Sequence, residues 1–379
     1  MATSSCLVDF PTEILLLIFK EASTIGYRTD ISSKNLCGPS PTPPSSTQSL
    51  SHHPLQPTPL NIAGVCLRWR EITLNTPQLW SSFALSLDPD RLGTHLALYR
   101  LGLYLSRSKD SPLMIRVHGS LEGTSDVPGV DVLIRKLCGS IGRWKALDVT
   151  NTSLPEGWDS MFQSFFQLLG ASKLDLKPQL LSSLTLSEPL HTDNYKATSS
   201  GSKASPFDTL FLGITSLTVT PRLHLHRLWH GGLLNRCSAT LTDLTIELLG
   251  VPNETSLYHW QVLPSLRSLT VVVKWRRGSP KDALTSIFVG LICPELKKME
   301  LRIEMEEPSK LAYWPGPVAL EFLSAVGLPL GVDHDQVREE ELEGGGLEEL
   351  LLVDVKMSAQ ELADLREAVP GARIYMKSM

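Results

Sequence analysis

Short apolar runs alternate with polar positions along much of the chain, and their period differs between its parts. Near the start, residues 14–19 are apolar on every face of a helix, and Pro11 and Glu13 just before them suit a first helical turn. A second helix is predicted where apolar residues recur every three to four positions, at Ile62, Val65, Cys66, Trp69, Ile72 and Thr73. Pro77 is expected to end that helix, with Trp80 on the returning chain.

A stretch of different composition separates these two helical segments. Residues 27–59 are rich in proline and serine and carry no hydrophobic period. Such a composition buries too little apolar surface to offset the entropy lost on folding. The sequence therefore predicts a disordered insert at 27–59.

Beyond Trp80 the apolar runs become shorter and strand-like. Runs at 82–87, 113–119 and 144–149 are separated by helical patterns at 91–107 and 130–143. Short strands that alternate with helices indicate parallel strands joined by crossover connections. This part of the chain is therefore predicted to have an α/β fold (α+β for the whole chain).

A stricter pattern then recurs, in which apolar residues occupy the first, fourth and sixth positions of each unit. It is found at Trp144/Leu147/Val149, Leu181/Leu184/Leu186, Ile214/Leu217/Val219, Leu241/Leu244/Ile246, Leu266/Leu269/Val271, Leu296/Met299/Leu301 and Leu347/Leu350/Leu352. The pattern is similar to that of irregular leucine-rich repeats, whose units stack into one continuous core. Such repeats often carry Asn or Cys at the ninth position, where this chain has Thr152, Pro189, Arg222, Leu249, Lys274, Glu304 and Val355.

The last segment has the signals of a terminal repeat. Ser358 and Glu361 are spaced as a capping box at the start of a helix, and Leu362 and Leu365 continue its apolar stripe. The pair Pro370–Gly371 is expected to stop this helix before a last short strand.

The two helical segments near the start carry a motif in two halves. The residues that carry it are Phe10-Pro11-Thr12-Glu13-Ile14, Ile18-Phe19, Val65-Cys66-Leu67-Arg68-Trp69-Arg70 and Leu79-Trp80. Together they resemble an F-box over roughly residues 7–85, of the type abundant in mushroom-forming fungi. Two departures are Phe10, where the family usually has Leu, and the insert that separates the halves.

The resemblance implies a partner and a set of contact residues. In the family, the helical F-box packs on a Skp-type adaptor, which joins it to a cullin. By that analogy the adaptor face would consist of Pro11, Ile14, Leu15, Ile18 and Phe19. Val65, Cys66 and Trp69 would hold the core of the motif and part of the interface, and Trp80 would close that core.

The resemblance also implies a division of the chain and a function. Residues 1–81 are expected to form the F-box-like module, and residues 82–379 an irregular leucine-rich-repeat-like solenoid. The chain would then be a non-catalytic substrate-recognition subunit of a Skp–cullin–F-box ubiquitin ligase, which holds an unknown protein target near the conjugating enzyme. The alternative is a leucine-rich-repeat interaction scaffold whose degenerate F-box has no role in ubiquitination.

Composition narrows the remaining classes of function. A net charge of −5 and a pI near 6.1 argue against a nucleic-acid-binding surface. No apolar stretch approaches the ~20 residues of a membrane span, and the start of the sequence lacks a basic, signal-like segment. The scattered cysteines include no CxxC pair, which is typical of small core residues in a reducing compartment. A cytoplasmic or nuclear location, or both, is expected.

Few residues along the chain are candidates for catalysis or for binding a metal or nucleic acid. The chain has none of the short motifs of nucleotide-binding loops, zinc proteases or serine hydrolases, so no enzyme activity and no cofactor are expected. His224, His226 and His230 are the best metal candidates, but no acidic or Cys partner completes a site, so a polar repeat edge is favoured. The basic run 274–278 is too short for a nucleic-acid groove. The polar segments 191–206 and 332–346 are expected to be solvated loops.

Overall fold

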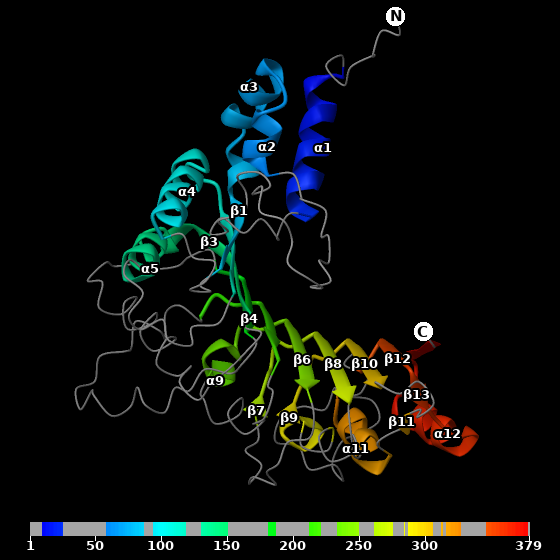
Figure 1. The fold of residues 1–379 in the computed structure, drawn as a ribbon. Helices are drawn as coiled ribbons and strands as arrows, with labels where there is room; N and C mark the ends of the chain where they lie inside the picture. The colour runs from blue at the N-terminus through cyan, green and yellow to red at the C-terminus, as the bar shows by residue number, and fades with distance from the viewer. Residues whose placement is uncertain are drawn as a thin grey trace, which may run out of the picture. The chain divides into compact units, whose positions relative to one another are not determined.

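A computed structural model gives the fold in two compact units, residues 1–181 and 182–379 (Figure 1). It describes residues 10–25, 58–86, 94–118, 130–150, 181–186, 212–220, 233–249, 261–275, 284, 287–305, 312–313, 316–326 and 346–377. The predicted insert up to residue 57, the three candidate histidines, and the two polar loops except Gly346 lie outside the described residues. Each unit is considered by itself below.

The first unit combines a helical start with parallel strands. Its elements are α1 (Thr12–Ile25), α2 (Pro59–Ala63), α3 (Leu67–Asn75), the 3-10 turn η3 (Pro77–Trp80), β1 (Ser82–Ser86), α4 (Thr94–Arg107), β2 (Leu113–His118), α5 (Val130–Cys138), η5 (Ile141–Arg143) and β3 (Trp144–Thr150). β2 pairs in parallel with both β1 and β3, and α4 and α5 form the crossovers. The strands and helices predicted between residues 82 and 149 are therefore confirmed.

The single helix predicted across residues 62–73 is wrong, because the chain breaks it into α2 and α3. Gly64 ends α2, and Cys66 takes an extended conformation, where its Sγ accepts from the Trp69 N–H at 3.5 Å. The start of α2 also shortens the predicted insert at its end, because Thr58 caps this helix and Pro59 is its first residue. Pro77 follows the end of α3, as expected.

The second unit is built around parallel strands. Its elements are β4 (Ser183–Leu186), β5 (Ser216–Val219), α9 (Leu233–Cys237), β6 (Asp243–Leu249), β7 (Gln261–Val262), β8 (Ser268–Trp275), β9 (Leu291–Ile292), β10 (Lys298–Met305), β11 (Ala312–Tyr313), α11 (Pro317–Ala325), β12 (Glu349–Val353), β13 (Val355–Lys356), α12 (Ala359–Ala368) and β14 (Arg373–Lys377). The sheet order in this unit is β4-β5-β6-β8-β10-β12-β14, all parallel, and Figure 1 shows β6, β8, β10 and β12 side by side. β7 pairs with β9, and β11 pairs with β13.

The register of these strands follows the recurring apolar pattern. Leu269 lies opposite Leu244 on one side and Met299 on the other, and Met299 lies opposite Leu350. All four side chains are buried. Because equivalent positions of each unit meet across the sheet, apolar residues form continuous rows on its covered face. The chain thus has a mixed α/β fold with parallel strands, as predicted.

The end of the chain also agrees with its sequence signals. The Ser358 Oγ accepts from the Glu361 N–H at 3.2 Å, and the Glu361 carboxylate accepts from the Ser358 N–H at 2.7 Å. This capping box opens α12, and Gly371, at φ +90°, turns the chain into β14. The hydrogen bonds from Ser358 lower the pKa of the Glu361 carboxyl, since they favour its charged form.

Candidate protein-docking surface

One side of α1 is apolar and open. Ile14, Leu17 and Ile18 are 40%, 64% and 44% exposed, and Pro11 is exposed at the start of the same helix. Residues spaced by three and four positions share one face of a helix, so these side chains form a single stripe. We call Pro11, Ile14, Leu17 and Ile18 the α1 stripe. An exposed set of adjacent large apolar side chains is typical of a protein-binding surface.

The adjoining side of α1 is packed inside the chain. Leu15 and Phe19 are buried, and the Phe19 ring meets the Trp69 ring edge-on with centroids 4.8 Å apart. Leu15 and Phe19 therefore belong to the core of this unit and lie away from the surface predicted for the adaptor. The buried pair and the α1 stripe therefore lie on adjoining sides of the helix, and burial separates them.

Hydrogen bonds from Arg68 link the start of α1 to α3. The Arg68 guanidinium donates to the Phe10 carbonyl at 2.8 Å and approaches the Thr12 Oγ1 at 3.4 Å. Phe10 and Arg68 are 58 positions apart in the sequence. Figure 1 shows α1 alongside α2 and α3. The two halves of the motif therefore meet, although the insert separates them in the sequence.

The residues predicted for the core of the second half have different environments. Val65 is 61% exposed, so it lies outside the core, contrary to the prediction. Cys66 is half-buried and serves as the N-cap of α3. Trp69 is half-buried against Phe19, and its Nε1 is buried without an acceptor among the described residues. Val65 was misplaced because the predicted helix was broken by the turn at residues 64–66.

Trp80, the last residue of η3, is a core residue, as expected. It is buried, and its Nε1 donates to the Thr73 carbonyl at 2.8 Å. Its ring also meets the Tyr104 ring edge-on at 5.3 Å between centroids. Burial raises the pKa of the Tyr104 hydroxyl well above its usual value, which keeps it neutral.

Sequence reasoning missed several exposed apolar residues in this region. Leu17 was left out of the predicted set, although it lies within the run that is apolar on every face. Leu60 and Leu67, on α2 and α3, are also exposed. No sequence signal marks Leu67 or Leu60 as exposed.

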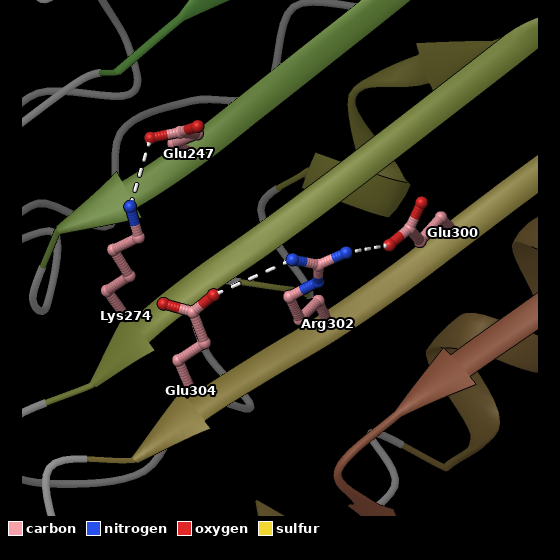
Figure 2. A network of polar contacts seen from close by, with 5 residues as sticks. All are labelled: Glu247, Lys274, Glu300, Arg302 and Glu304. Carbon is pink, nitrogen blue, oxygen red and sulfur yellow. Dashed lines mark hydrogen bonds and ion pairs between the residues drawn. The ribbon is translucent and has the colours of Figure 1, made fainter. Parts of the chain in front are cut away.

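The open face of the sheet in the second unit has a different chemistry. On β4, β5, β6 and β8, the in-register row Thr185, Thr218, Thr245 and Thr270 is half-exposed. Farther along the strands, Lys274 on β8 reaches Glu247 on β6 at 3.3 Å. Figure 2 shows this pair, and also Arg302 on β10 between Glu300 at 2.6 Å and Glu304 at 3.9 Å. These five residues carry two positive and three negative charges, and each cation is paired with at least one carboxylate.

Residues that could bind a metal ion are not gathered in the described parts of the chain. Across those ranges, no group of three or more His, Cys, Asp or Glu residues is placed to hold a metal ion. Burial raises the pKa of the Cys237 and Cys293 thiols to about 12, so both are protonated and unreactive near neutral pH. No helix within the same residues has the length and apolarity to cross a membrane.

Comparisons with known proteins add no family to these observations. No protein-family model matches the chain, and no curated protein matches it significantly.

Proposed function

We propose that this protein is the substrate-recognition subunit of a Skp–cullin–F-box ubiquitin ligase and has no catalytic activity of its own. The adaptor would bind the α1 stripe, and through the adaptor the chain would join a cullin. Residues 82–379, interpreted as an irregular leucine-rich-repeat solenoid, would hold an unknown protein target. The complex would work in the cytoplasm, the nucleus or both.

The observation that carries this proposal is the meeting of the two motif halves. Arg68 and Trp69 from the second half contact Phe10 and Phe19 from the first. This arrangement holds α1 in place while its stripe stays uncovered. Burial of a Leu or Ile side chain contributes about 1.5–3 kcal/mol, so a partner that covers the three large residues of the stripe gains substantial binding free energy.

The alternative is an interaction scaffold with a degenerate F-box and no role in ubiquitination. The burial of Leu15 and Phe19 in the chain's own core favours this alternative, because an adaptor cannot reach these side chains. Phe10, in place of the usual Leu before the proline, points the same way. The adaptor surface distinguishes the two functions, because both use the solenoid predicted at residues 82–379 to bind a protein.

Co-purification tests this choice directly. The full chain would be co-expressed with a Skp-type adaptor and isolated through a tag on the chain. The ligase proposal expects a stoichiometric complex that survives size-exclusion chromatography. Recovery of the chain alone, folded by circular dichroism, would favour the scaffold.

A further inference from the structure

The last strand of the second unit has an open edge. β14 pairs in parallel with β12 on one side, and none of the described strands pairs with its other side. The Arg373 N–H donates to the Glu348 carbonyl and the Lys377 carbonyl accepts from the Asp354 N–H, both at 2.9 Å. Backbone groups alternate in direction along a strand, so the N–H and C=O groups of Ile374 and Met376 point away from β12. This edge can accept another strand.

The side chains of β14 are only partly covered. Ile374 and Met376 lie opposite the buried Leu350 and Leu352, and so are on the covered face of the sheet. Even so, Met376 is 50% exposed and Tyr375, on the other face, is 49% exposed. A neighbouring strand with apolar residues at alternate positions would cover Met376 and Ile374 and leave polar residues beside Tyr375.

Charge indicates what kind of strand fits this edge. Arg373 and Lys377 flank the strand and share the face of Tyr375. Arg373 pairs with Glu349 on β12 at 2.8 Å, but Glu349 also pairs with Lys298 at 3.0 Å, so positive charge stays in excess along this row. If two copies of the chain paired antiparallel about Tyr375, Arg373 of one would lie opposite Lys377 of the other. Like charges directly opposite each other destabilise a strand pair, whereas opposite charges stabilise it. The edge therefore disfavours this self-pairing and fits a strand with acidic residues at its ends.

We propose that the free edge of β14 binds an extended segment of another protein, with apolar residues at alternate positions and Asp or Glu opposite Arg373 and Lys377. Backbone hydrogen bonds to Ile374 and Met376 supply the pairing, and the charges select the partner. This site is independent of the α1 stripe, so it does not rest on the ligase proposal.

Two fluorescently labelled peptides, acetylated and amidated, test the site on the full chain by anisotropy. One has the sequence Glu-Val-Thr-Val-Glu and the other Lys-Val-Thr-Val-Lys; both read the same in either strand direction. The acidic peptide is expected to bind roughly tenfold more tightly than the basic one. Lys377→Glu should reduce or reverse that preference, and Ile18→Asp, in the α1 stripe, should leave it unchanged.

Backbone pairing is tested separately from charge. Ile374→Pro removes an outward N–H without removing a hydrogen bond to β12, so it should abolish binding of the acidic peptide. If that variant does not fold, N-methylation of all five peptide residues, which removes the inward N–H groups for either strand direction, makes the same test on the unaltered protein, and binding should again be lost. Equal binding of the two peptides, failure of both to bind, or undiminished binding of the N-methylated peptide would overturn the proposal. A dimer of the parent chain that Met376→Lys dissociates would overturn it in favour of a second copy.

Discussion

At the scale of single residues, Trp69 joins the two halves of the motif. Its ring packs edge-on against Phe19, and Arg68 beside it holds the start of α1. Trp69→Ala should lower the free energy of unfolding by about 2–4 kcal/mol, somewhat less than is usual for a fully buried Trp, because this side chain is only half-buried. Urea titration followed by circular dichroism measures the change. Tyr99→Ala, at an exposed aromatic on α4, is the matched control and should change stability by less than about 0.5 kcal/mol.

The two buried thiols give the chain a defined dependence on alkaline pH. Burial raises the pKa of Cys237 and Cys293 from 9.0 to about 12, so the unfolded chain releases these protons at lower pH than the folded chain. Their contribution to stability is full below pH 9.0 and is lost as the pH rises toward about 12. The urea midpoint should therefore fall as the pH rises from 9 toward about 12. Cys293→Ala should reduce the size of that fall, and an unchanged fall would contradict this account.

Side-chain roles within α1 were only partly predictable from the sequence. A run that is apolar on every face gives no periodicity from which to choose its buried side. The family resemblance placed Leu15 and Phe19 with Ile14 and Ile18, whereas packing against Trp69 separates the two pairs. Leu17 was missed for the same reason, because only the packing of α1 against Trp69 shows which side of the helix stays exposed.

At the scale of elements, the rows of apolar side chains hold the sheet of the second unit together. Leu269 on β8 is fully buried between Leu244 and Met299, and the next residue, Thr270, faces the open side. Leu269→Ala should lower the free energy of unfolding by about 2–5 kcal/mol, because it leaves a cavity in the row. Thr270→Ala on the same strand should cost less than about 1 kcal/mol. Similar losses for the two variants, measured by urea titration, would contradict the assignment of faces.

Strands were predicted more reliably than the helices near the start. A period of two residues, repeated in each unit, fixes both the strand and the face it buries, so β4, β5, β6, β8, β10 and β12 lie where the pattern places them. The short strands β7, β9 and β11 were not predicted. The break between α2 and α3 was hidden because apolar spacing continues through it. Gly64 was its one local signal, and the capping role of Cys66 depends on a weak sulfur acceptor that propensities do not reveal.

At the scale of the whole molecule, the segment between the motif halves is expected to be dispensable for docking. Residues 30–54 have no hydrophobic period, and loop-closure entropy changes slowly with length. Deletion of this range, with Thr58 and Pro59 kept because they start α2, should leave adaptor affinity within a few-fold of the parent value. Isothermal titration calorimetry of both proteins provides the comparison. A loss of a hundredfold or more would make the segment part of the interface.

The central claim is that the α1 stripe binds a Skp-type adaptor, and one affinity comparison tests it most directly. The full chain, its Ile18→Asp variant and its Leu212→Asp variant would be titrated with purified adaptor. Leu212 is also an exposed leucine but lies in the second unit, so its variant controls for a new surface charge. Ile18→Asp strands a carboxylate in an apolar interface and should weaken binding by several orders of magnitude while helical content is kept. Leu212→Asp should bind as the parent does. If Ile18→Asp binds the adaptor as tightly as the parent, the α1 stripe is not the docking surface.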